Sequence, residues 1–298
     1  MTTPYPVLPE FEYIKPNSFK NASNFLAENP DTAAPFLGGT DIFVQLRDRA
    51  IEKRYLIDVK TLDGMNELNF HPDNGLTIGA AVNMNRIIKS LEINSQYKIL
   101  ADACRSVASY QLRNRATIIG NICNASPAGD TIGASMILDG ILITHGINGW
   151  GELSLKEFFL APGKTTLLPG DIVTAIRFPS PKSKIIGKYI KLGRNNKSDL
   201  AIVGVTVIGY QNKQTTSRYS IKLALASVGP TPLIISDIEK LLSQSRISTQ
   251  SIHEAAIIAM ESCNPIDDVR GSAGYRKAMV RNLSQLALLD VCNQLGII

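Results

Sequence analysis

The sequence predicts an α+β protein with two domains. Through the first 180 of its 298 residues, short β-type runs alternate with runs of helical spacing and with glycine-rich turns. Pro179-Ser-Pro181 then interrupts this alternation, and three longer β-rich runs and three helical runs follow it. At roughly 150 residues per domain, the length fits two separate cores. We therefore expect one domain over residues 1–180 and a second over residues 181–298.

The expected elements of the first domain follow from its periodicity. Four runs have the composition of strands: residues 55–59, 76–79, 140–144 and 171–178. Two runs carry apolar residues at helical spacing: residues 83–91, which Asn83 can cap, and residues 97–110. The sequence contains no internal repeat.

The second domain has a different order of elements, with strands first and helices after them. Three β-rich runs come in close succession, at residues 189–192, 200–210 and 219–227. Three runs with broad apolar stripes follow, at residues 235–242, 249–262 and 275–295. These patterns predict a three-stranded antiparallel sheet backed by helices.

The composition excludes several classes of protein. With 44% hydrophobic and 19% charged residues, the chain is typical of a folded globular protein and not of a disordered or collagenous one. The richest apolar stretch, residues 136–144, is interrupted by Asp139 and is shorter than the roughly 18 apolar residues of a membrane span. The first ten residues lack the basic residues and apolar core of a secretory signal. We therefore expect a cytoplasmic protein without a membrane span.

The cysteines and histidines form no recognisable site pattern. The four cysteines, Cys104, Cys123, Cys263 and Cys292, include no C-x-x-C pair and have no histidines at ligand spacing. None of the three histidines has a serine, cysteine or aspartate partner at a catalytic spacing. The sequence therefore predicts no metal site in this chain, and it disfavours a hydrolase triad.

A glycine-rich segment is the first candidate site. Residues 35–42 read Pro-Phe-Leu-Gly-Gly-Thr-Asp-Ile, an apolar run that ends in two glycines, a hydroxyl and a carboxylate. Glycines let backbone N–H groups approach an anion closely, so a phosphate would fit there. The same residues also suit an ordinary strand-to-helix turn with an N-cap. Alone, the motif leaves both interpretations open.

A polar run over residues 111–130 is the second candidate site. It reads Gln-Leu-Arg-Asn-Arg-Ala-Thr-Ile-Ile-Gly-Asn-Ile-Cys-Asn-Ala-Ser-Pro-Ala-Gly-Asp, and periodicity does not explain it. Thr117, Asn121 and Ser126 can hydrogen-bond hydroxyls or phosphate oxygens, and Asp130 can accept from a ribose or ribityl hydroxyl. The alternative is a polar loop that satisfies its own backbone through Asx and Ser turns.

Taken in order, these segments resemble the FAD-binding medium subunit of the molybdenum hydroxylases, the family of xanthine dehydrogenase, carbon monoxide dehydrogenase and bacterial nicotinate or aldehyde oxidoreductases. The resemblance covers the full length, and its order and spacing make chance agreement improbable. It is carried by Leu37-Gly-Gly-Thr-Asp41, Leu56-Ile-Asp-Val59, Leu76-Thr-Ile-Gly-Ala80, Gln111-Leu-Arg-Asn114, Asn124-Ala-Ser-Pro-Ala-Gly-Asp130, Leu168-Pro-Gly-Asp-Ile172 and Arg270-Gly-Ser-Ala-Gly-Tyr275.

The resemblance implies a fold and a cofactor. The fold would be an FAD-binding domain of the vanillyl-alcohol-oxidase type, with two α+β lobes, followed by the small C-terminal domain of these flavoprotein subunits. Residues 35–42 would form a first pyrophosphate loop and residues 117–121 a second. Asp130 would hydrogen-bond FAD, and Val107 and Val173 would be apolar contacts. The implied FAD-binding residues are Pro35, Phe36, Leu37, Gly38, Gly39, Thr40, Asp41, Ile42, Val107, Thr117, Ile118, Ile119, Gly120, Asn121, Asp130, Val173 and Lys191.

Two of these positions bear on flavin chemistry. Lys191 would lie near the flavin, where a positive charge stabilises the reduced, anionic form. Considered without the family, Lys191 is an ordinary solvated lysine. Ile119 is a departure, because the family usually has a glycine there. A β-branched residue resists positive φ and fills space, so either Ile119 points away from the cofactor or FAD binding is weakened.

A basic stretch follows the expected domain boundary and raises the question of nucleic acid. It lacks the interleaved aromatic residues of a strand-stacking surface, so we expect no nucleic-acid partner. We interpret most of it as a solvated connector, and a face for an acidic partner subunit or a nicotinamide phosphate stays open. The stretch contains Lys182, Lys184, Lys188, Lys191, Arg194 and Lys197.

The resemblance finally implies the function of an FAD-carrying oxidoreductase subunit. Substrate would be oxidised at a molybdopterin centre on a large partner subunit, and electrons would pass through [2Fe-2S] clusters on a small partner subunit. FAD on this chain would deliver them to NAD, oxygen or a quinone, and no residue here would be a catalytic acid or base. Two alternatives stay open. One is a scaffold subunit that has lost FAD, with Ile119 as the lesion, and the other is a stand-alone flavin oxidase.

Overall fold

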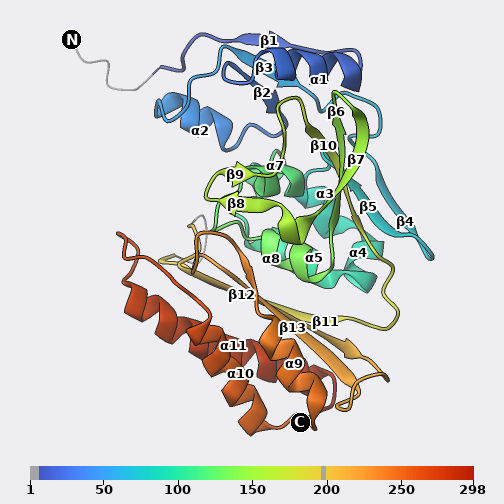
Figure 1. The fold of residues 1–298 in the computed structure, drawn as a ribbon, viewed down its shortest axis with the longest axis vertical. Helices are drawn as coiled ribbons and strands as arrows, with labels where there is room; N and C mark the ends of the chain where they lie inside the picture. Colours follow the sequence, from blue (N-terminus) through green and yellow to red (C-terminus); the bar gives the residue numbers. More distant parts are fainter. Residues whose placement is uncertain (1–6, 196–198) are drawn as a thin grey trace.

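A computed structural model describes residues 7–195 and 199–298 of the chain (Figure 1). Lys197 of the basic stretch lies outside the described residues. The fold is α+β, as predicted. Two lobes built from the first 180 or so residues stack along the long axis, and the C-terminal sheet with its helices lies at the opposite end from the N-terminal lobe (Figure 1).

The N-terminal lobe is a small parallel sheet. β1 (Glu12–Ile14) and β2 (Ala33–Phe36) both pair in parallel with β3 (Tyr55–Asp58), which lies between them. α1 (Phe19–Glu28) connects β1 to β2, and Ser18 caps it by accepting from the Asn21 N–H. α2 (Ile42–Arg47) starts soon after β2 ends. The carboxyl ends of β2 and β3 therefore lie side by side, next to the glycine-rich segment.

The second lobe contains an antiparallel sheet of five strands, in the order β4-β5-β10-β6-β7. The strands are β4 (Leu68–His71), β5 (Gly75–Gly79), β6 (Ile141–Gly146), β7 (Gly149–Ser154) and β10 (Ile172–Phe178). Its helices are α3 (Met84–Lys89), α4 (Leu91–Gln96), α5 (Lys98–Ser106), α6 (Tyr110–Arg113), α7 (Ile118–Cys123) and α8 (Ile132–Ile137). A short 3₁₀ turn, Leu155–Glu157, and the hairpin of β8 (Phe159–Ala161) and β9 (Lys164–Thr165) precede β10.

The C-terminal part is an antiparallel sheet with helices on one face (Figure 1). The three predicted strands are β11 (Ile186–Leu192), β12 (Val203–Gln211) and β13 (Tyr219–Ala226), and the two-residue β14 (Leu233–Ile234) adds a fourth. α9 (Ser236–Gln244), α10 (Thr249–Glu261) and α11 (Ala273–Gln294) cover the far face, while α5 and α8 approach the near face (Figure 1). Both faces are covered, so residues 203–209 are all buried.

The structure corrects one predicted helix. Residues 97–110 do not form a single helix, because α5 ends at Ser106 and the four-residue α6 starts at Tyr110. Ala108 lies between them with a φ of 37°, a left-handed conformation that a right-handed helix cannot contain. Apolar spacing alone does not reveal such a break.

Close contacts join the C-terminal sheet to the second lobe. Gly187 of β11 packs directly against Ile99 of α5, and Gly133 of α8 packs against Thr206 of β12. Asp139 contributes a charged contact, since its carboxylate lies 2.9 Å from the Lys222 Nζ of β13. Small residues at the two glycine positions let the elements approach more closely than side chains would permit.

We predict that Gly187→Ala destabilises the protein, because an added Cβ would lie 2.9 Å from the Ile99 Cβ. Overpacking of this kind costs about 1–3 kcal/mol. Gly274→Ala, near the start of α11, is the control, since a Cβ there meets no atom within 4 Å and alanine favours a helix by roughly 0.5–1 kcal/mol. Urea unfolding followed by circular dichroism measures both. An equally small effect of the two substitutions would contradict a tight contact at Gly187.

Candidate functional site

A cavity of about 530 Å³ lies where the two lobes and the C-terminal sheet meet. This volume is in the range of small-molecule sites. Residues from the N-terminal lobe, the second lobe and β11 all line it, so the cavity depends on the assembled chain. The predicted site residues that line it are Pro35, Leu37, Gly38, Gly39, Thr40, Asp41, Ile42, Val107, Thr117, Ile119, Gly120, Asn121, Asp130, Val173 and Lys191.

Two predicted site residues do not line the cavity. The Phe36 side chain is 4% exposed and packs against the rings of Tyr13 and Phe43, with the Lys60 Nζ 4.6 Å from its ring centroid. Strand alternation explains this, because successive residues of β2 face opposite sides of the sheet. Ile118 is 1% exposed and belongs to the hydrophobic core, so its side chain anchors the first turn of α7 in that core.

The glycine-rich segment forms a loop of free backbone donors. Among the residues that the structure describes, no acceptor faces the N–H groups of residues 38–42. Gly39 has a φ of 79°, which favours glycine. Gly38 lies so close to the Arg115 carbonyl that a Cβ would overlap it. Several unpaired N–H groups on one loop form a receptor for an anion.

Asp41 links this loop to the C-terminal end of α7. It accepts a hydrogen bond from the Asn124 Nδ2 at 3.3 Å, and the Asn124 Oδ1 accepts from the Gln45 Nε2 at 3.1 Å. Asp41 precedes α2 but makes no side-chain cap bond, so the first N–H groups of that helix stay available. Burial raises the pKa of the Asp41 carboxyl, and the hydrogen bond from Thr40 opposes that rise.

The second loop starts α7. Thr117 caps this helix, since its Oγ1 accepts from the Gly120 N–H at 2.9 Å. Ile119 lies in the first turn with ordinary helical backbone, and it is not among the described residues with positive φ. The conflict expected between a β-branched residue and positive φ therefore does not arise. Its side chain is 1% exposed, and it forms part of the cavity wall.

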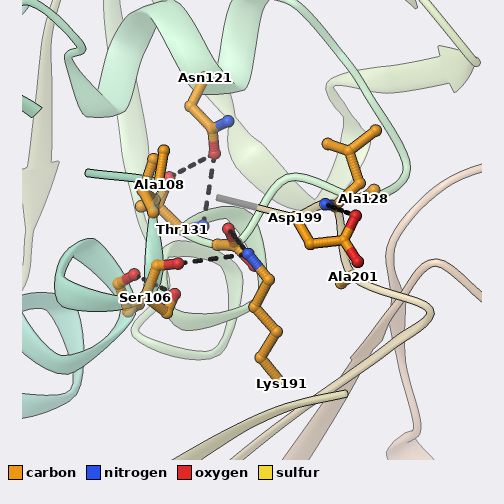
Figure 2. A network of polar contacts seen from close by, with 12 residues as sticks. Ser106, Ala108, Asn121, Ala128, Thr131, Lys191, Asp199 and Ala201 are labelled. Carbon is orange, nitrogen blue, oxygen red and sulfur yellow. Dashed lines mark hydrogen bonds and ion pairs between the residues drawn. The ribbon is translucent and has the colours of Figure 1, made fainter. Parts of the chain in front are cut away.

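A buried charge network closes the cavity between the second lobe and β11 (Figure 2). Asp130 accepts from the Tyr189 Oη at 2.7 Å and from the Lys191 Nζ at 2.8 Å. Lys191 also donates to the Ser106 carbonyl at 3.2 Å. Burial raises the pKa of Asp130, and its pairing with Lys191 opposes that rise. Burial also raises the pKa of Tyr189 well above its ordinary value, so this phenol is a hydrogen-bond donor.

Asn121 faces the cavity from the far side of this network (Figure 2). Its Oδ1 accepts from the Thr131 Oγ1 at 2.7 Å and from the Thr131 N–H at 3.3 Å. Within residues 7–195 and 199–298, its Nδ2 has no hydrogen-bond acceptor. Thr131 therefore fixes the amide so that its donor end is free for a ligand.

Several cavity residues were not predicted from the sequence. Asn124 and Asp171 stand within the motifs quoted above, so their polar character was the available signal. Lys53 and Asp199 stand outside those motifs, and no pattern marks them. Asp199 accepts from the Arg194 N–H at 2.7 Å, and this hydrogen bond lowers the pKa of its carboxyl.

The part of the chain that the structure describes contains neither a cluster of metal-ligand side chains nor a membrane-spanning helix. No group of three or more histidine, cysteine, aspartate or glutamate side chains has the arrangement of a metal site. None of the described helices is long and apolar enough to cross a membrane.

Comparison with known proteins agrees with this geometry. A family model described as the FAD binding domain in molybdopterin dehydrogenase matches residues 9–181. A second model, the CO dehydrogenase flavoprotein C-terminal domain, matches residues 188–291. Together the two models cover most of both parts of the fold.

Individual relatives match over almost the whole chain. The glyceraldehyde dehydrogenase medium chain of Sulfolobus acidocaldarius is 29% identical over 286 residues, which are 95% of this chain and 99% of the relative. The xanthine dehydrogenase FAD-binding subunit of Escherichia coli O157:H7 is 25% identical over 285 residues, 95% and 97% of the two chains. A solved carbon monoxide dehydrogenase from Hydrogenophaga pseudoflava, which lacks the Mo-pyranopterin moiety, gives a TM-score of 0.89 at 28% identity, with 95% and 97% covered. The chain therefore belongs to the family of FAD-binding medium subunits of the molybdenum hydroxylases, and it is an oxidoreductase subunit.

Proposed function

We propose that this chain holds FAD in the cavity and passes electrons from [2Fe-2S] clusters on a small partner subunit to an external acceptor. A large partner subunit with molybdopterin would oxidise the substrate. The observation that carries the proposal is the cavity itself, where a loop of free N–H donors and the half-buried Lys191 line one continuous space. The names of the relatives, which include medium chains and FAD-binding subunits, support the division of labour among subunits.

The residues of the cavity fit FAD. The unpaired N–H groups of residues 38–42 suit the oxygens of a pyrophosphate, and Asn121 offers a further donor. Val107 and Val173 offer apolar surface to a flat ring. Bound FAD supplies the redox chemistry, since it takes up two electrons and releases them singly or in pairs. We also propose the domain boundary at residues 180 and 181, which the two family matches support.

The chain's own residues provide binding and electrostatics. Lys191 places a positive charge at the cavity wall, and Asp130 offsets part of that charge from 2.8 Å. Asp130 and Asp41 each accept hydrogen bonds from neighbouring side chains, which supports a structural role for both carboxylates. The proposed role is therefore electron transfer, with substrate chemistry on a partner subunit.

Gly38→Ala in the assembled complex tests the proposal. A Cβ would overlap the Arg115 carbonyl, so the loop must shift and FAD should be lost, with at least tenfold lower occupancy by absorbance. Substrate should then still reduce the clusters of the partner subunit, while reduction of the external acceptor stops. Gly274→Ala is the control, since a Cβ there meets no atom within 4 Å and the residue does not line the cavity. Acceptor reduction at the normal rate by an FAD-free complex would contradict the proposal.

We predict that Lys191→Met and Asp130→Asn move the flavin midpoint potential in opposite directions. Removing Lys191 withdraws a positive charge, which lowers the potential. Removing the charge of Asp130 leaves Lys191 uncompensated, which raises the potential. Shifts of roughly 30 mV correspond to about 1.4 kcal/mol for two electrons. Spectroscopic redox titration measures them, and two shifts of the same sign would show that the pair does not act through charge.

We predict that Ile119→Gly does not improve FAD binding. Ile119 is buried in the first turn of α7, so its loss should destabilise the protein by about 2–4 kcal/mol through the missing side chain and the weaker helix. Thermal unfolding and FAD titration measure the two effects. A large gain in FAD affinity would instead support a scaffold subunit that has lost its cofactor.

A further inference from the structure

The turn between α5 and α6 forms part of the cavity wall through Val107 and Ala108. Ala108 adopts a φ of 37°, a conformation that costs an alanine of order 1 kcal/mol and persists only when surrounding contacts enforce it. Arg113 of α6 makes those contacts. Its Nη1 donates to the Val107 carbonyl at 2.7 Å, to the Ala108 carbonyl at 2.9 Å and to the Arg105 carbonyl at 3.3 Å.

Arg113 is itself positioned by a hydrogen bond to Asn85. Its Nε donates to the Asn85 Oδ1 at 3.4 Å, and the Asn85 Nδ2 donates to the Asn114 Oδ1 at 2.7 Å. Asn85 is 5% exposed and lies on α3. Arg113 does not line the cavity, whereas Val107 and Ala108 do. The guanidinium therefore lies behind the turn, on the side away from the cavity.

The geometry of the peptide bond between Val107 and Ala108 then determines the direction of the Ala108 N–H. In a trans peptide the C=O and the following N–H point in opposite directions. Since the Val107 carbonyl points to Arg113, the Ala108 N–H points away from Arg113 and toward the cavity side. Within the described residues, this N–H has no acceptor. The neighbouring Ser106 carbonyl accepts from Lys191, so the N–H lies beside the charge network of the cavity (Figure 2).

We infer that Arg113 is a positioning residue, which aims the Ala108 N–H into the cavity to donate a hydrogen bond to FAD. This inference rests on the proposed function, because it takes the cavity as the FAD site. Ala108 is half-buried, and its N–H has no partner in the described residues, so a flavin acceptor atom would supply the missing hydrogen bond. Arg113 would thus act on the cofactor through the backbone without touching it.

Three proteins test the inference: the unmodified chain, Arg113→Ala and Arg105→Ala. Arg105 is the matched control, because it is a neighbouring arginine whose side chain bonds Asp102 and Asn94 instead of the turn. FAD affinity is measured by fluorescence titration. Hydrogen exchange of the Ala108 amide is measured with and without FAD, by mass spectrometry with electron-transfer fragmentation.

FAD should slow exchange of the Ala108 amide in the unmodified chain and in Arg105→Ala. Arg113→Ala should bind FAD roughly tenfold more weakly, the loss expected for one hydrogen bond, and should lose that protection. Guanidinium chloride at millimolar concentration should restore part of the affinity, whereas sodium chloride should not. Loss of Ala108 protection in a folded Arg113→Ala protein is the result that a merely structural role would not give.

Two results would overturn the inference. One is an Ala108 amide that FAD does not protect in the unmodified chain, which decides the question even if Arg113→Ala fails to fold. The other is a folded Arg113→Ala protein with unchanged FAD affinity. If the unmodified chain itself bound no FAD, the cavity assignment under the proposed function would fail first, and the two failures are thereby distinguished.

Discussion

The ion pair between the buried Asp130 and the half-buried Lys191 is the interaction on which the cavity depends. It joins the segment after α7 to β11, so it links the second lobe to the C-terminal sheet at the point where both line the same space. Burying two charges is costly unless each is paired and hydrogen-bonded. The Tyr189 hydroxyl donates a further hydrogen bond to Asp130, and the Ser106 carbonyl accepts one from Lys191. The pair therefore constrains how the sheet docks, because a shift of β11 would leave buried charges without partners.

Close packing supports the same docking. Gly187 and Gly133 let α5 and α8 approach the sheet directly, and the near face of that sheet shares the core of the second lobe through Ile208 and Ala224. On the opposite side of the cavity, Gly38 packs against the Arg115 carbonyl and brings the two loops together. The cavity thus lies between layers that pack directly on one another, and none of the layers lines it alone.

The elements were more predictable from the sequence than the cavity wall. Long periodic runs such as residues 249–262 match their helix within a residue, since tertiary packing agrees with the local pattern there. The break at Ala108 was missed, because hydrogen bonds from the Arg113 side chain hold the turn, and apolar spacing does not reveal them. Phe36 was misplaced because a loop motif does not state which way a strand residue faces. Asp199 reaches the cavity through a hairpin connection, so no local signal identifies it.

The charges of the site suggest where its attraction for an anionic cofactor comes from. The cavity wall carries two lysines against four aspartates, so its side chains contribute no net positive charge. The residues are Lys53, Lys191, Asp41, Asp130, Asp171 and Asp199. The remaining donors are backbone N–H groups on residues 38–42 and at Ala108, together with the Asn121 amide. Such groups do not titrate, and their positions are set by packing. Much of the attraction for an anionic cofactor is therefore a property of the folded backbone.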